Sequence, residues 1–371
     1  MESSPINRLP PDSLHQIFSS LPLRQIMICR SVCKFFNHLL TSQPFTEIIS
    51  TRPPLNLLAL RPPHHHHRHR HVSIPHPHIN VYDPDENRWL RFNLDFLPFR
   101  SPQPVASSSG LIYLWCESVN SADSCKSLVA CNPLTRQFKV LPQLGSAWSR
   151  HGTVLVDSVN RVMVLTELAA LYYSGTVVAN RWLKFSSNLP SKPRSPVLTS
   201  TSVFALCDVG SPWRSQWKLF SCRLTSLAVV TAHTNWTCLE RHEWGDIFDI
   251  IKRPRLVRGE GEDKLLMIGG LKSTFSLNPA CSTILILRLC LEGLEWEEAG
   301  RMPLEMYRGF QESSKFKVFG GGDRVYFSAK RIGKLAMWDC WDGWRWVDGV
   351  SGYGDGLCRG FVFEAKLTLM Q

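Results

Sequence analysis

The chain has 371 residues, of which 44% are hydrophobic and 20% are charged, a composition typical of a globular protein and not of a disordered one. Its length allows two or three ordinary domains, or one large repeat domain with a small module. The formal charge is +11, but the basic residues are scattered and the densest run, residues 252–258, leads directly into Glu260 and Glu262, so we predict no nucleic-acid binding.

The twelve cysteines form no C-x-x-C pair, and most of them lie in apolar runs, which is typical of reduced thiols in the cytosol or nucleus. The first twelve residues do not resemble a signal peptide, and no apolar run approaches the roughly 18–20 residues that span a bilayer. We therefore expect a protein of the nucleus and/or cytoplasm, without membrane contact.

Residues 11–40 carry apolar side chains with a helical period. In the first segment they fall at i, i+3, i+4 and i+7, which form one helix face: Leu14, Ile17, Phe18 and Leu21. Pro11 suits the first turn of this helix, and Pro22 ends it. A second short helix carries Ile26 and Met27, and a third carries an apolar stripe formed by Val32, Phe35, Phe36, Leu39 and Leu40.

Three helices in about forty residues form a core that is too small to be stable alone. This segment has no disulfide or metal ligands that could compensate. The apolar content also exceeds what a three-helix bundle can bury. We therefore predict that these helices present a binding surface to a partner protein.

The segment LPPDSLHQIFSSLPLRQIMICRSVCKFFNHLL resembles an F-box, the module that docks onto the Skp adaptor of SCF ubiquitin ligases. The family usually has Trp where Phe36 stands here, but an aromatic residue is kept. The resemblance implies adaptor binding by these positions: Leu9, Pro10, Leu14, Ile17, Phe18, Leu21, Pro22, Ile26, Cys29, Arg30, Val32, Cys33, Lys34 and Phe36. The alternative is a helical arm that only packs on the main domain.

A histidine-rich tract follows a short apolar run at Leu55–Leu60. Eight of the thirteen histidines lie between His64 and His78, flanked by prolines. Such tracts can bind zinc or nickel, but prolines keep a chain extended, and we interpret this tract as an inserted loop. We predict no metal site and no cofactor.

Beyond the tract, short strands recur in units of roughly 40–50 residues. Each unit has an apolar strand, an Asp-Pro or Asn-Pro turn and an aromatic residue that begins the next strand, as in INVYDPDENRWLRF and LVACNPLTRQFKVLP. Later units keep Trp182, Trp236 and Trp296, and glycine pairs follow two strands at residues 269–270 and 320–322. Such repeats indicate a β-propeller. We expect six blades, near residues 54–98, 103–142, 150–190, 198–245, 262–303 and 315–349, with the C-terminal tail closing the ring.

The repeats resemble kelch repeats, and the whole chain is similar to the plant F-box/kelch class, above all to its Skp-interacting-partner members. A WD-type propeller fits less well, because Trp338-Asp339 lacks the Gly-His partner motif. The predicted fold is a small all-α three-helix F-box followed by an all-β kelch-like β-propeller. The predicted domains are residues 1–50 for the F-box, 51–80 for the insertion and first strand, and 54–371 for the propeller.

Catalytic motifs are lacking. Asp208–Trp213 partly matches the Asp-box turn of sialidases but occurs once and lacks its Ser and Thr positions. There is no G-x-S-x-G, no P-loop and no H-E-x-x-H motif. We therefore predict that the chain is not an enzyme and has no catalytic residues.

Propeller topology predicts a binding face for a target protein. The loop leading into each innermost strand and the loop between the second and third strands open on one face. Arginine and aromatic residues are enriched at binding hot spots, and several arginines favour an acidic or phosphorylated segment. The residues that we expect on this face are Arg100, Trp148, Arg150, Arg194, Trp213, Tyr307 and Arg308, with His151 and Asp208 nearby.

The resemblance and the two domains together predict a substrate-recognition adaptor of an SCF ubiquitin ligase. The F-box would dock the Skp adaptor, through it the cullin and RING subunits, and the propeller would bind a target protein for ubiquitination. The alternative is a propeller scaffold for protein interactions without a degradation role.

Overall fold

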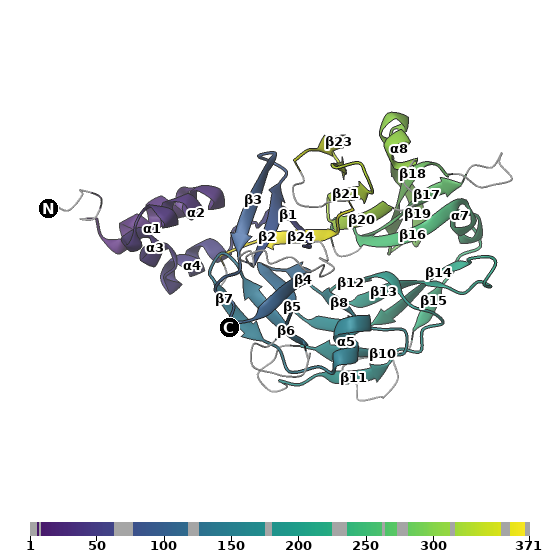
Figure 1. The fold of residues 1–371 in the computed structure, drawn as a ribbon, viewed down its shortest axis with the longest axis horizontal. Coiled ribbons are helices and arrows are strands. Elements are labelled where there is room, and N and C mark those ends of the chain that lie inside the picture. Colours follow the sequence, from purple (N-terminus) through teal and green to yellow (C-terminus); the bar gives the residue numbers. More distant parts are fainter. Residues whose placement is uncertain are drawn as a thin grey trace, which may run out of the picture.

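The structure is a computed structural model. It describes residue 6 and residues 9–62, 77–117, 126–174, 180–224, 236–261, 264–272, 281–311, 316–349 and 357–367. These residues form two parts (Figure 1), a group of helices from the first fifty residues and a ring of sheets from the rest of the chain. No described helix is both long enough and apolar enough to cross a membrane.

The N-terminal helices are α1 (Pro11–Ser20), α2 (Leu23–Val32), α3 (Lys34–Leu40) and α4 (Gln43–Ser50). Proline sets two boundaries: Pro11 occupies the first turn of α1, where no N–H is needed, and Pro22 directly precedes α2. Cys33 caps α3, its Sγ accepting a backbone hydrogen bond at 3.4 Å. The three predicted helices are confirmed. The structure adds α4, which buries Phe45 and Ile49 against the others.

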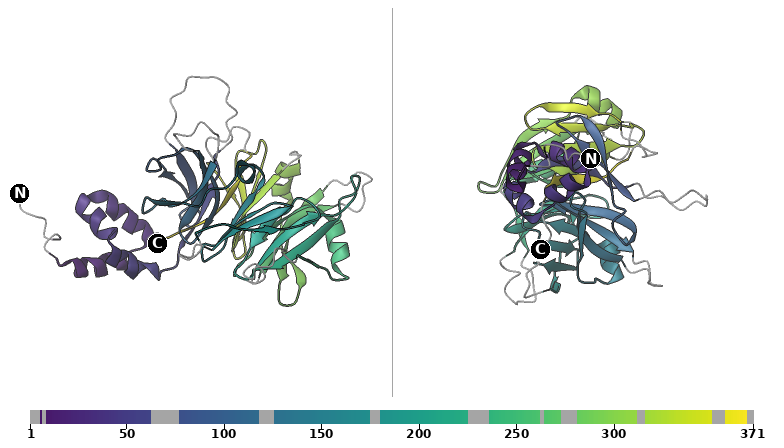
Figure 2. Two further views of the ribbon diagram at one scale, coloured as in Figure 1. Left: turned by 90° about the horizontal axis from the view of Figure 1, so that it is seen from below. Right: turned by 90° about the vertical axis from the view of Figure 1, so that its left-hand side faces the viewer.

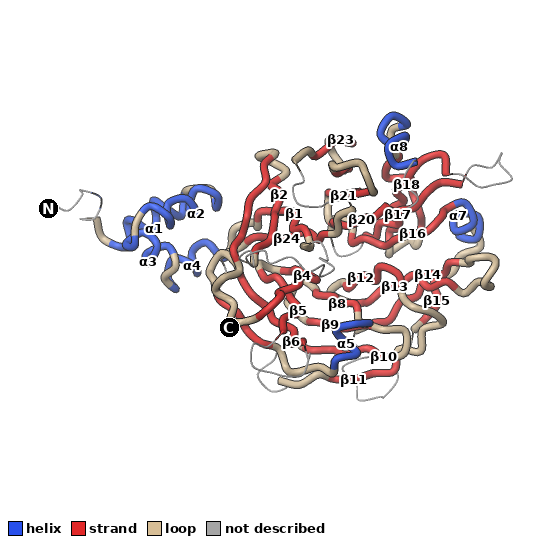
Figure 3. Tube along the Cα trace, in the orientation of Figure 1, coloured by secondary structure: helices blue, strands red, loops and turns tan. Residues whose placement is uncertain are grey.

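The rest of the described chain forms six antiparallel sheets of four strands, the blades of a β-propeller (Figure 3). From the innermost strand outward, blade 1 comprises β24 (Gly360–Ala365), β1 (Leu55–Leu60), β2 (His78–Asp83) and β3 (Arg88–Asn93), and blade 2 comprises β4 (Arg100–Ser108), β5 (Leu111–Glu117), β6 (Lys126–Asn132) and β7 (Gln137–Val140). Blade 3 comprises β8 (Thr153–Val156), β9 (Val162–Leu165), β10 (Ala169–Tyr173) and β11 (Leu183–Ser186), and blade 4 comprises β12 (Arg194–Leu198), β13 (Ser202–Asp208), β14 (Trp217–Arg223) and β15 (Thr237–Leu239). Blade 5 comprises β16 (Ile251–Arg258), β17 (Lys264–Lys272), β18 (Cys281–Cys290) and β19 (Glu295–Arg301), and blade 6 comprises β20 (Phe316–Gly321), β21 (Arg324–Ala329), β22 (Leu335–Asp339) and β23 (Gly343–Val347).

The C-terminal tail closes the ring, as predicted. Its strand β24 pairs with β1 over six residues, from Leu55 opposite Ala365 to Leu60 opposite Gly360. Blade 1 is therefore built from both ends of the propeller sequence. This closure removes the exposed strand edge that an open ring would leave.

The Asp-Pro and Asn-Pro units form the predicted tight turns. Asp83 Oδ1 accepts hydrogen bonds from the amides two and three residues later at 3.2 and 3.3 Å. Asn132 makes the same contacts in blade 2, at 2.9 and 3.4 Å. Asp339 makes them in blade 6, at 2.9 and 3.3 Å, although Cys340 and not a proline follows it. All three side chains are buried. Each replaces a missing backbone partner, which is why Asp and Asn are favoured in such turns.

The basic run at residues 252–258 belongs to β16, the innermost strand of blade 5. This blade therefore begins at Ile251 and not near residue 262. Its apolar residues Leu256 and Val257 are buried, whereas the basic side chains are exposed or partly exposed. The histidine-rich tract joins β1 to β2 and lies outside the described residues, except that His78 begins β2.

The propeller has two faces. The connections into innermost strands and the loops between second and third strands lie at one end of every blade, which we call the distal face. The loops between third and fourth strands lie at the opposite end, the proximal face. Three short helices, α5 (Ser146–His151), α7 (Trp244–Ile250) and α8 (Leu304–Gln311), each precede an innermost strand and belong to the distal face. The N-terminal helices join β1 at the proximal face and project from the ring (Figure 2).

Candidate functional site

The N-terminal segment exposes an unusual number of apolar side chains. Because these helices already have a buried core, a set of this kind in one small module marks a surface for a partner protein. The exposed fractions reach 58% at Ile28 and 65% at Val32. The other members of the set are Ile6, Leu9, Ile17, Phe35 and Ile48.

The structure places the predicted adaptor-binding residues in three environments. Exposed residues are Leu9, Pro10, Ile17, Pro22, Val32, Cys33 and Lys34, and partly exposed ones are Leu21, Cys29, Arg30 and Phe36. Leu14, Phe18 and Ile26 are buried, with exposed fractions of 4% or less. These three side chains hold the helices together, so any effect that they have on adaptor binding is indirect.

Four residues of this exposed set were not among the predicted positions: Ile6, Ile28, Phe35 and Ile48. Ile28, Val32 and Phe35 are spaced at i, i+4 and i+7, a period that would have placed them on one side of a continuous helix. The chain breaks between α2 and α3 at Cys33, but all three side chains remain exposed. The spacing could therefore have identified these residues as part of an exposed apolar surface.

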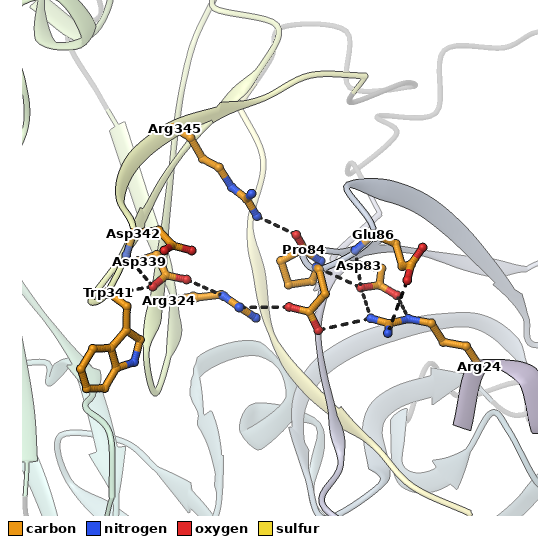
Figure 4. Close-up of polar contacts among 10 residues, drawn as sticks. Arg24, Asp83, Pro84, Glu86, Arg324, Asp339, Trp341, Asp342 and Arg345 are labelled. Atoms are coloured by element: carbon orange, nitrogen blue, oxygen red, sulfur yellow. Dashed lines mark hydrogen bonds and ion pairs between the residues drawn. The ribbon is translucent and has the colours of Figure 1, made fainter. Parts of the chain in front are cut away.

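Arg24 of α2 attaches the helices to the proximal face of the propeller. Its guanidinium donates from Nε to Asp83 Oδ2 at 2.5 Å and from Nη2 to Asp83 Oδ1 at 2.6 Å (Figure 4). Asp83 is fully buried at the turn between β2 and β3, and Arg24 is 19% exposed. The same Nη2 also contacts Asp85 at 3.2 Å. A bidentate ion pair of this kind fixes the orientation of the two side chains as well as the distance between them.

The contacts continue from this turn into blade 6. Arg324 donates from Nε to Asp339 Oδ2 at 2.8 Å and from Nη2 to Asp85 Oδ1 at 3.1 Å. Arg345 donates to the carbonyl of Pro84 at 2.7 Å (Figure 4). The turn that holds the helices is therefore itself held by the neighbouring blade, where the ring closes.

The pKa values at this junction favour charged carboxylates. Burial alone would raise the pKa of Asp83, but hydrogen bonds from Arg24 and from backbone amides outweigh it, so this pKa lies below its usual range. The pKa of Asp339 is lowered in the same way, with Arg324 as its cation. At neutral pH both ion pairs are fully formed.

The helices also share an apolar core with blades 1 and 2. One continuous cluster contains Leu14 and Phe45 from the helices together with Leu134 and Phe363 from the propeller. Arg30 adds a hydrogen bond from Nη1 to the carbonyl of Leu134 at 2.6 Å. The propeller thus supplies part of the support that so small a module needs, and the exposed apolar set is what remains for a partner.

The residues predicted to bind a target all belong to distal elements, but they are not equally accessible. Arg100 begins β4, Arg194 begins β12, and Trp148 and Arg150 lie on α5. Trp213 lies in the loop between β13 and β14 and is 95% exposed. Other exposed residues are Arg100, Arg150, His151 and Arg308, and Trp148, Arg194 and Asp208 are partly exposed.

Tyr307 does not reach the surface. It is buried in the cluster between blades 5 and 6, and its hydroxyl donates to the carbonyl of Cys281 at 2.7 Å. Its side chain therefore cannot contact a target, although its neighbour Arg308 can. Tyr307 positions α8. Sequence alone did not distinguish the buried Tyr307 from the exposed Arg308, because both residues precede an innermost strand.

Comparisons with known proteins agree with the two-part architecture. Residues 6–48 match the family described as F-box domain. The chain is 85% identical to SKP1-interacting partner 15 of Arabidopsis thaliana, with 100% of both chains covered. An F-box/kelch-repeat protein of the same plant is 26% identical over 97% of this chain and 89% of its own, and Protein UNUSUAL FLORAL ORGANS is 23% identical over 98% and 85%.

Solved structures are more distant. The β-propeller domain of the Trilobed protease from Pyrococcus furiosus aligns with 84% of this chain and 94% of its own at a TM-score of 0.41 and 10% identity, too weak a likeness to inform function. The full-length identity and the F-box match confirm the resemblance to the F-box/kelch class. The chain belongs to the F-box protein family of SKP1-interacting partner 15.

Proposed function

We propose that this chain is the substrate-recognition subunit of an SCF ubiquitin ligase. Its N-terminal helices dock a Skp-family adaptor, which connects it to the cullin and RING subunits. The distal face of the propeller binds the target protein. The observation that carries this proposal is an F-box with an exposed apolar set, held by Arg24 to the propeller face opposite the distal loops. The printed name of the 85% identical relative supports the adaptor partner.

We infer that the chain supplies no chemistry of its own. Two of the eleven described cysteines illustrate this: burial raises the pKa of Cys116 to about 12 and that of Cys207 to about 11, so these two thiols stay protonated at neutral pH and are poor nucleophiles. The adaptor acts by proximity, because it raises the effective concentration of target lysines near a charged ubiquitin-conjugating enzyme. We expect this to take place in the nucleus or the cytoplasm.

Replacement of exposed apolar residues tests the docking step. Ile28→Asp combined with Val32→Asp places two charges in the exposed set without touching the buried core. Skp adaptor retained by the purified full chain should fall at least tenfold, measured by pull-down and by isothermal titration. Leu168→Asp is the matched control, because Leu168 is 70% exposed but lies in the propeller.

The same variants separate an adaptor from a scaffold. In plant cells the double variant should raise the level of proteins captured by the propeller, because they are no longer delivered for ubiquitination, and proteasome inhibition should remove the difference. Undiminished Skp retention by the double variant would refute the docking surface. Unchanged target levels despite lost retention would favour the scaffold without a degradation role.

A further inference from the structure

The distal end of the central channel is strongly basic. A cavity of about 660 Å³ opens there, at the distal ends of the innermost strands. Six cationic side chains line it, and the one carboxylate among its described lining residues is Asp208. The cationic residues, which we call the cationic mouth, are Arg61, Lys192, Arg194, Arg255, Lys317 and Arg359.

Asp208 offsets only part of this charge, because it attracts Arg194 but is one carboxylate among six cationic side chains. Its Oδ1 accepts hydrogen bonds from the amides of Gly210 at 3.1 Å and Gln216 at 2.9 Å, so the carboxylate is used to hold its own loop. The cationic mouth therefore keeps a large net positive charge. Low-dielectric walls around such a charge concentrate its field and attract anions.

Two arginines of the cationic mouth are fixed in position and keep unused hydrogen-bond donors. The guanidinium of Arg194 stacks on the Trp217 ring, 4.5 Å from its centroid, and its buried Nη1 has no hydrogen-bond partner. Arg255 donates from Nη1 to the carbonyl of Pro254 at 3.2 Å. A guanidinium has five N–H donors in a fixed fork, so both retain the capacity to bind an oxyanion without first being ordered.

Neighbouring arginines also repel one another. Burial lowers the pKa of Arg255 to about 10, helped by Arg194, Arg253 and Arg359. The pKa of Arg61 is likewise lowered to about 10 by burial and by Arg359. These groups stay charged at neutral pH, and a bound anion would relieve the repulsion. Like charges at partly buried positions destabilise the unliganded protein, which makes this cluster a candidate for a ligand site.

The innermost strands around the cationic mouth have a strained backbone at equivalent positions. The registers of β12 and β16 shift between Arg194 and Val197 and between Lys252 and Arg255, and within these bulges Ser195 and Arg253 have φ of 46° and 54°. Bulges redirect side chains, and strained residues of this kind concentrate at functional sites. Innermost strand β4 repeats the bulge after Arg100, with φ of 48° at Ser101.

We propose that the cationic mouth binds the phosphate of a phosphorylated side chain in the target protein, with Arg194 and Arg255 as its principal ligands. The proposal rests on the proposed adaptor function and assigns a chemistry to its target-binding face. A phosphate suits the site better than a single carboxylate, because it carries up to two charges and three acceptor oxygens. A single guanidinium can bind such a group through two parallel hydrogen bonds. The exposed Trp213 on the same face is available to residues that flank the phosphate.

The test uses the full chain and two pools of fluorescent heptapeptides of random sequence, one with a central phosphoserine and one with a central serine. We expect the phosphoserine pool to bind at least about tenfold more tightly at 150 mM salt and to be displaced by tripolyphosphate. Arg194→Gln with Arg255→Gln should abolish the preference. Arg241→Gln with Arg331→Gln removes the same charge from exposed distal loops outside the cavity and should preserve it.

Three outcomes would overturn the proposal: equal binding of the two pools, equal loss in both double variants, or binding of tripolyphosphate without any preference for the phosphoserine pool. The last would indicate a site for a free phosphorylated compound. Skp retention measured on the same preparations tests the adaptor function separately. Its absence in a chain that still prefers phosphoserine would refute the adaptor function and leave the phosphate site standing.

Discussion

Single side chains decide how the helices are attached to the propeller. Arg24 and Asp83 are 59 residues apart in the chain, yet their ion pair fixes α2 on the turn between β2 and β3. The sequence predicted this turn from its Asp-Pro pair, because the turn depends on neighbouring residues. It could not predict the partner of Asp83, because a contact between distant segments depends on how two finished units pack together.

Asp83→Asn tests how much the ion pair between Arg24 and Asp83 contributes to this attachment. Asn132 forms the same turn in blade 2, so asparagine should preserve the turn while removing the charge that Arg24 contacts. We expect the junction to lose about 1–3 kcal/mol, less than for a fully buried pair because Arg24 keeps Asp85. Hydrogen exchange of α2 should accelerate, while that of blades 3 and 4 stays unchanged. Asp95→Asn, in an exposed pair with Arg136, should have almost no effect.

Acid should weaken the same junction. Because the pKa values of Asp83 and Asp339 lie below the usual range, their charged forms stabilise the folded state above the ordinary carboxyl pKa of about 4. That stabilisation is lost as pH falls through the lowered values. The melting temperature of the natural chain should therefore exceed that of Asp83→Asn at pH 6, and the gap should narrow towards pH 3. A gap independent of pH would contradict this assignment.

At the scale of elements, the paired glycines allow close strand packing. A Cβ added at Gly269 of β17 would lie 2.3 Å from Ile251 Cγ2 and 2.9 Å from the Lys252 carbonyl of β16. We expect Gly269→Ala to destabilise blade 5 by about 1–3 kcal/mol, seen as a lower melting temperature and faster exchange in β16. Gly245→Ala in α7 is the control, since its Cβ would meet nothing within 4 Å. An equal loss in both variants would rule out overpacking as the cause.

The elements also show where sequence patterns stop being informative. Strands with apolar runs, such as β17 and β18, were recognised because both of their faces are buried. β16 was not, because basic residues interrupt its apolar pattern, among them Arg255, which lines the cavity at the distal end of the channel. The repeated Arg-Ser-Pro at residues 100–102 and 194–196 and the related Lys-Arg-Pro at 252–254 would have marked these strands.

At the scale of the whole molecule, the two ends of the chain stabilise each other. The shared core joins Leu14 and Phe45 of the helices to Phe363 of β24, the strand that closes the ring. The helices are thus anchored where the propeller closes. In the proposed function, this anchoring would present a target on the distal face in a fixed orientation relative to the adaptor. This coupling implies that loosening the closure should also loosen the helices.

Phe363→Ala tests this coupling. Phe363 is fully buried and lies edge-on to Phe92, with ring centroids 6.1 Å apart, so truncation should cost about 3–5 kcal/mol. Urea unfolding should shift to lower concentration, and hydrogen exchange should accelerate in both β1 and the N-terminal helices. Val362→Ala removes apolar volume from the opposite side of the same strand, where the side chain is partly exposed, and should cost less. If exchange accelerates in β1 but not in the helices, the closure and the F-box are independent, and the junction is held by the polar contacts of Arg24 and Arg30.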